Sequence, residues 1–169
     1  PDSRDQTPWD DPSYDVWGVN EEYHYDWMKR YDLWFQMHPR WDFTRQNNMN
    51  HFNHFNWLKN EIGPCVKCNG TGKLGEGEKQ NNCDECKEGI YSPDPRRTGI
   101  PIIMQEQNDD IPYSIRFPLE EVTALQPQGG APYFTSSIAF MLTLAYLMGY
   151  KRIELYGFEI GTQTEYHYQ

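Results

Sequence analysis

The sequence predicts an α/β fold, in which helices flank a parallel sheet and a small cysteine-rich segment interrupts the chain. Strand-like and helix-like segments alternate before and after the cysteines, which is typical of parallel sheets. All four cysteines fall within residues 65–86, whereas all six tryptophans fall within residues 9–57. The longest apolar stretch follows the cysteines. We therefore expect one α/β domain over residues 1–62 and 98–169, with an inserted module over residues 63–97.

Length and charge exclude several classes of protein. The chain has 169 residues, enough for one domain with a core and a small satellite module. Aromatic residues make up 15% of it and argue against disorder. The net charge of −10 disfavours binding to nucleic acid or to an anionic membrane surface, because both are negatively charged. No apolar run approaches the roughly 18 residues of a membrane-spanning helix. We expect neither a nucleic-acid partner nor a membrane span.

Four elements are expected before the cysteines. They are a strand, a helix, a second strand and a second helix, over residues 14–20, 21–30, 32–38 and about 48–61. The first strand is rich in β-forming residues and stops at the polar Asn20. The first helix has acids in its first turn and bases in its last, which suits the helix dipole. The second strand is stopped by Pro39.

Four more elements are expected after the cysteines. They are a strand, two helices and a last strand, over residues 100–105, 118–125, 138–148 and 152–156. Hydroxyls of residues 135–137 precede the second of these helices and can cap it, and Gly149 supplies its stop. This helix is apolar on nearly every face, so we expect it to be buried against a sheet.

The cysteines form two C-x2-C pairs, Cys65 with Cys68 and Cys83 with Cys86, separated by 14 residues. Because each pair presents two sulfurs from one turn, this spacing predicts a structural zinc site of the ribbon or knuckle type. The metal would supply most of the folding energy of so small a module. The alternative is two disulfides. Nothing marks a secreted chain, so we expect free thiols and a reducing, cytoplasmic compartment.

Three segments resemble bacterial CMP-sialic-acid-dependent sialyltransferases. In residues 133–159 a Thr-Ser pair opens an apolar helix, and Gly-Tyr-Lys and a strand ending in Gly-Phe-Glu follow it. Residues 14–20 resemble the family's second strand, and residues 33–39 resemble its third. The chain also resembles uncharacterised phage-encoded proteins of the same type, which suggests a phage-infected bacterium as its setting. The resemblance implies a Rossmann-like parallel sheet with flanking helices, a nucleotide at the carboxyl ends of its strands, and nucleotide-sugar-dependent glycosyl transfer.

The resemblance also implies roles for five residues. Asn20 and His38 would contact the nucleotide, with His38 standing where the family has Asn. Thr135 and Ser136 would line the donor site, and Tyr166 would approach the phosphate leaving group as the catalytic residue. Each has a simpler interpretation. Asn20 can be a turn residue, Thr135 and Ser136 a helix cap, and Tyr166 a packing or tail residue.

Two parts of the family pattern are absent from the sequence. The family opens with a strand and a Gly-Asn-Gly-Pro-Ser type loop, and its general-base histidine lies beyond the tyrosine motif. We therefore expect the chain to be a fragment that lacks both parts. Tyr133 also replaces a family arginine, and Gly161 replaces an active-site tyrosine. The alternative hypothesis is a non-catalytic, zinc-stabilised structural or interaction protein, whose partner is another protein rather than a nucleotide.

Overall fold

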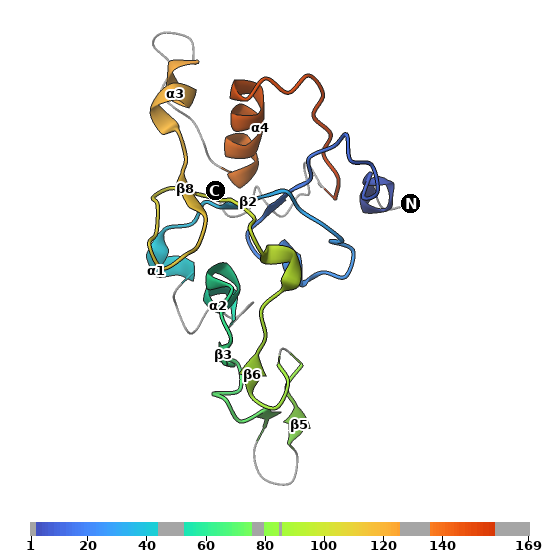
Figure 1. Cartoon of the computed structure of the whole chain (residues 1–169), viewed down its shortest axis with the longest axis vertical. Helices are drawn as coiled ribbons and strands as arrows, with labels where there is room; N and C mark the ends of the chain where they lie inside the picture. The colour runs from blue at the N-terminus through green and yellow to red at the C-terminus, as the bar shows by residue number, and fades with distance from the viewer. Residues whose placement is uncertain (1–2, 44–52, 76–79, 85, 126–135, 158–169) are drawn as a thin grey trace, which may run out of the picture.

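The computed structural model describes residues 3–43, 53–75, 80–84, 86–125 and 136–157, and its centre is a parallel sheet (Figure 1). The strands are β1 (Trp17–Val19), β2 (Leu33–Gln36), β7 (Ile102–Met104) and β8 (Ser114–Arg116). They lie in the order β1-β2-β7-β8, and every neighbouring pair is parallel. This arrangement, together with the helices beside it, confirms the expected α/β fold with a parallel sheet.

Alternate residues of the strands face two separate apolar cores. Trp34 and Ile102 point to the core that contains Trp57 and Leu58 of α2 (His54–Lys59). Phe35 and Ile103 point to the opposite core, which contains Val122 of α3 and Leu144 of α4. The helices α3 (Leu119–Ala124) and α4 (Ser137–Leu147) therefore lie on the opposite side of the sheet from α2 (Figure 1). Both central strands are buried on both faces, which explains their continuous apolar runs.

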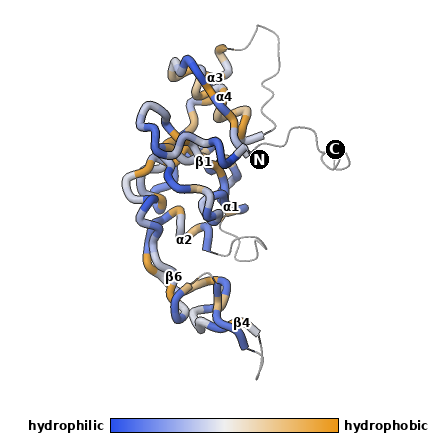
Figure 2. Tube along the Cα trace, turned by 90° about the vertical axis from the view of Figure 1, so that its right-hand side faces the viewer, coloured by the Kyte–Doolittle hydropathy of each residue, from blue (hydrophilic) through white to orange (hydrophobic). Residues whose placement is uncertain are grey.

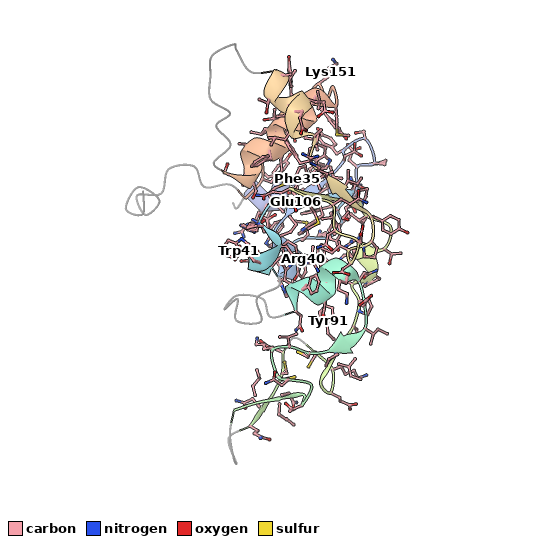
Figure 3. The ribbon with its side chains drawn as sticks, turned by 90° about the vertical axis from the view of Figure 1, so that its left-hand side faces the viewer. Phe35, Arg40, Trp41, Tyr91, Glu106 and Lys151 are labelled. Carbon is pink, nitrogen blue, oxygen red and sulfur yellow. The ribbon has the colours of Figure 1, made fainter. Side chains whose placement is uncertain are left out.

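The cysteine-bearing segment forms two short antiparallel pairs away from the main sheet. β3 (Gly63–Pro64) pairs with β6 (Ile90–Tyr91), and β4 (Lys73–Leu74) pairs with β5 (Asn81–Asn82). These strands lie at the end of the molecule opposite α3 and α4 (Figure 2). Tyr91 joins this segment to the sheet because it is buried in the same core as Trp57, and it lies at the junction below α2 (Figure 3).

The expected helix over residues 21–30 is wrong. Only the 3-10 turn η2 (Glu22–His24) forms there. The guanidinium of Arg96, which lies in η4 (Pro95–Arg97), donates to the carbonyl oxygens of Tyr23 and Met28. Because a distant side chain satisfies these carbonyls, the segment does not need the hydrogen bonds of a helix.

The expected strand over residues 152–156 is also wrong, since these residues form no strand in the structure. They run near β1, but side chains make the contact, since the Tyr14 hydroxyl donates to the Glu154 carboxylate at 3.5 Å. Beside β1, the backbone N–H of Val19 acts to lower the pKa of the Glu22 carboxyl, against the larger effect of burial.

The expectation of a buried helix over residues 138–148 holds only in part. Leu144 and Ala145 are buried, whereas Tyr146 and Met148 are 70% and 56% exposed. Among the described elements α4 packs on β2 and α3, and most of its residues are half-buried rather than fully buried. Two further elements, β8 and α1 (Arg40–Phe43), are present without having been expected. The helix expected over about 48–61 is represented by α2, and residues 48–52 lie outside the described residues.

Candidate functional site

The four cysteines form a compact cluster of thiols. Their sulfur atoms all lie within 4.8 Å of one another, with Cys65 to Cys83 at 3.8 Å and Cys68 to Cys86 at 3.6 Å. All four are free thiols, so the alternative of two disulfides is wrong. A tetrahedron of sulfurs about 2.3 Å from a central metal has edges of about 3.8 Å. The spacing of the cluster therefore fits a metal ion with four sulfur ligands.

Tight backbone turns hold the sulfurs in place. After the first pair, the N–H of Gly70 donates to the Cys65 carbonyl at 2.9 Å, and the N–H of Gly72 donates to the Cys68 sulfur at 3.2 Å. Gly72 has a φ of +73°, and a Cβ there would come within 2.9 Å of the Gly89 nitrogen. A residue without a side chain is needed at this point, because the two halves of the segment touch through their backbones.

The electrostatics of the cluster favour unequal ionisation of its thiols. Burial opposes ionisation of Cys68, but the Gly72 N–H and the neighbouring thiols outweigh it and lower the pKa of Cys68 to about 7. Burial and the neighbouring thiols raise the pKa of Cys86 to about 12. A divalent cation removes this conflict, since it compensates the charge that the sulfurs acquire. With four sulfurs bound, no coordination position remains open, which is the chemistry of a structural site.

A second group of polar residues lies at the carboxyl edge of the sheet. Asn20 follows β1 with a left-handed φ of 53°, and its backbone N–H donates to the Phe35 carbonyl at 2.9 Å. Its carbonyl accepts from the Trp34 indole at 3.1 Å, but its side-chain Oδ1 is buried and has no hydrogen-bond partner among the described residues. His38 follows β2, the neighbouring strand, and is half-buried. The structure thus places these two residues after adjacent strands.

The sequence did not indicate the buried network beside these residues. His54, the first residue of α2, is 1% exposed, and its Nε2 lies 3.0 Å from Oε1 of the fully buried Gln36. Its Nδ1 lies 3.1 Å from the Tyr23 hydroxyl, and Glu21 Oε1 lies 4.0 Å from Nε2. Gln36 also reaches His38, whose Nδ1 lies 3.3 Å from its Nε2. A glutamine at the end of an otherwise apolar strand was the only available signal for this network.

The remaining expected site residues are less informative. Ser136 is the N-cap of α4, and its Oγ accepts from the Ala139 N–H at 3.3 Å, as the helix-cap interpretation requires. Thr135 and Tyr166 lie outside the described residues. Of the five positions that the sialyltransferase resemblance implied, the structure therefore describes Asn20, His38 and Ser136.

A cavity of about 430 Å³ lies along the outer edge of β1, between α4 and residues 150–156. Its walls are mainly apolar, with side chains such as Trp17, Trp27 and Met141. Glu22 also lines it, and burial raises the pKa of this carboxyl to about 6, although Val19 and Arg4 act in the opposite direction. Neither Asn20 nor His38 lines the cavity.

Comparisons with protein-family models, with curated proteins and with solved structures found no match. Across the described ranges, none of the helices combines the length and apolar character needed to cross a membrane.

Proposed function

We propose that this protein is a Rossmann-like nucleotide-binding domain, with a structural zinc ion in its four-cysteine centre. The observation that carries the nucleotide proposal is the side chain of Asn20. Its Oδ1 is buried after a strand of a parallel sheet and has no partner within the part of the chain that the structure describes. Leaving such an acceptor unsatisfied costs about 1–3 kcal/mol. An N–H or O–H of a bound base or ribose would supply the missing donor, and the carboxyl edge is where open α/β sheets bind ligands.

Zinc is the metal that suits the cysteine cluster best. Four thiolates in a tetrahedron select zinc or iron among biological metals, and a closed site with no vacant position is typical of structural zinc. Cys65, Cys68, Cys83 and Cys86 would be its ligands. The ion would hold together a segment whose strands are only two residues long.

The finer proposal is glycosyl transfer from a nucleotide sugar, which rests on the sequence resemblance. An acceptor hydroxyl would lose its proton to a general base and attack the anomeric carbon, and the bond from that carbon to the phosphate oxygen would break. Asn20 and His38 would hold the nucleotide. Ser136 and Thr135 would lie near the phosphate at the start of α4, where helix N–H groups favour an anion, and Tyr166 would stabilise the departing phosphate.

Calorimetric titration of the whole chain with CMP, CDP and UDP tests the nucleotide proposal. We expect at least one nucleotide to bind, and the variant Asn20→Gly to weaken that binding about tenfold, the effect of losing one hydrogen bond of about 1.4 kcal/mol. Glycine keeps the left-handed backbone while removing the amide. The matched control is Asn60→Gly, because Asn60 also has a left-handed φ and a buried Oδ1 that no described residue satisfies, but it is the C-cap of α2. Equal losses in both variants contradict the proposal.

A second candidate function is a non-catalytic interaction with another protein. It is favoured by the exposed apolar side chains at the end of α4 and just after it, namely Tyr146, Leu147, Met148, Ile153 and Leu155. The same titration separates the two candidates, since an interaction protein would bind none of the three nucleotides.

A further inference from the structure

Asn53 connects the metal centre to helix α2. Its side chain is fully buried, its Nδ2 donates to the Cys65 sulfur at 3.2 Å, and its Oδ1 accepts from the Val66 N–H at 2.9 Å. One amide group therefore contacts both a sulfur ligand and the backbone of the turn that carries it.

This amide does not perform the usual task of its position. Asn53 is the N-cap residue of α2, where an asparagine side chain normally accepts from the first N–H groups of the helix. No such cap bond is made, because the side chain faces Cys65 and Val66 instead. Helix α2 has only six residues, and so short a helix has little stability of its own. The start of α2 is therefore held by the turn that carries Cys65 and Val66.

The same helix also contacts the carboxyl edge of the sheet. His54, next to Asn53, contacts Gln36 at 3.0 Å, and Gln36 contacts His38 at 3.3 Å. One turn later the ring of Trp57 stacks on Tyr23, with centroids 3.9 Å apart and an interplanar angle of 4°. A displacement of α2 would therefore change the surroundings of Gln36 and His38.

From this chain of contacts we infer that Asn53 is an outer-sphere residue of the metal centre, through which metal binding fixes α2 and the His54–Gln36 contact at the sheet edge. The inference rests on the proposed metal but does not need the proposed nucleotide. Its physical basis is the charge of the site. Four thiolates around a divalent ion carry a net negative charge, and an N–H donor to one sulfur stabilises it.

The first experiment measures zinc affinity by competition with a chromophoric chelator. Loss of an outer-sphere partner typically weakens metal binding about 10–100-fold, and we expect this range for Asn53→Ala. Asn53→Asp should weaken zinc binding at least as much, because this substitution places a carboxylate next to a thiolate. The matched control is Asn56→Ala on the same helix, whose amide contacts the Pro64 carbonyl at 3.4 Å and touches no sulfur. Zinc affinity that is equal in the Asn53 variants and the control overturns the role of Asn53.

The second experiment uses the unmodified chain, so it does not depend on a variant that folds. Hydrogen exchange is followed with zinc bound and after chelation. Without metal, we expect the amide hydrogens of residues 54–59 to exchange at least about tenfold faster, while residues 102–104 of β7 keep their protection. Unchanged exchange over 54–59, or equal loss in both segments, contradicts the inference. The calorimetric titration with CMP, CDP and UDP is repeated on the zinc-bound and the chelated protein. If the exchange of α2 depends on metal while no nucleotide binds in either state, the proposed nucleotide binding fails and this inference stands.

Discussion

Gly18 on β1 lies directly against the indole of Trp34 on β2. A Cβ at position 18 would come within 2.1 Å of the ring carbon Cζ3, closer than real Cβ contacts allow. Trp34 is fully buried and also donates to the Asn20 carbonyl, so its ring has no room to move. The glycine therefore sets the position of the tryptophan that fills one core and helps hold the strand end where Asn20 lies.

Replacing this glycine should destabilise the whole domain. Overpacking in a close-packed core costs about 1–3 kcal/mol, and we expect Gly18→Ala to lie at or above the upper end because the contact is with a rigid ring. Chemical unfolding followed by tryptophan fluorescence measures the loss. The control is Gly63→Ala, where the nearest atom to a new Cβ is 4.0 Å away. Equal unfolding free energies for the two variants would contradict the packing argument.

Arg97 should be essential for joining three segments of the chain. It is 1% exposed, and its guanidinium donates to the carbonyls of Leu58, Ile100 and Pro112 at 2.8–3.0 Å. Burial lowers its pKa to about 10. We expect Arg97→Lys to lower the free energy of unfolding by about 3 kcal/mol, since a lysine cannot satisfy three diverging acceptors and leaves some of them buried without a donor.

The matched control for this prediction is an exposed arginine. Arg116 pairs with Glu120 at 3.1 Å, and both side chains are more than half exposed. Surface ion pairs contribute about 0–1 kcal/mol, so Arg116→Lys should leave the denaturation midpoint nearly unchanged. A comparable shift for both variants would show that the carbonyl cluster around Arg97 is not important.

Glu22 should make stability fall as pH rises. Burial raises its pKa from 4.5 to about 6, so the folded state holds this proton after the unfolded chain has lost it. The folded state is thus favoured at low pH and loses this advantage between about pH 4 and pH 7. A pKa shift of this size changes the free energy of unfolding by about 2 kcal/mol at most.

The variant Glu22→Gln removes the titration while keeping an oxygen for the Val19 N–H. We expect it to equal the parent near pH 4 and to be more stable above pH 7, by about 1–2 kcal/mol. Urea unfolding of both proteins across this range measures the difference. Two stability curves that stay parallel would falsify the assignment of this pH dependence to Glu22.

The cysteine centre should contain about one zinc ion per chain. We expect Cys83→Ser to reduce the bound zinc sharply. The backbone amides of residues 63–91 should also lose their protection from hydrogen exchange, because two-residue strands cannot hold that segment without the metal. Elemental analysis and hydrogen exchange measure the two effects. The control is Lys67→Ala, which removes the ion pair with Asp84 between the two C-x2-C pairs and leaves all four sulfurs in place. A metal-free protein whose segment stays protected would exclude the zinc proposal.

Local patterns in the sequence predicted several elements correctly. The apolar run before Pro39 contains β2, the Pro118 turn begins α3, and the hydroxyl of Ser136 caps α4. These features depend on neighbouring residues, which explains why they can be found without a structure. The expected helix over residues 21–30 and strand over 152–156 failed because their outcome depends on distant partners, Arg96 in one case and a neighbouring strand in the other.

The sequence by itself determined the parallel α/β arrangement and the cluster of four thiols, since alternation of elements and C-x2-C spacing are local properties. Only the tertiary structure decided that the Asn53 amide donates to the Cys65 sulfur, and that His54 contacts Gln36, 18 residues away in the sequence. The physical reason is that a buried polar side chain must find a partner wherever the packed chain provides one. Which partner it finds depends on how the chain packs, so it cannot be predicted from residue spacing in the sequence.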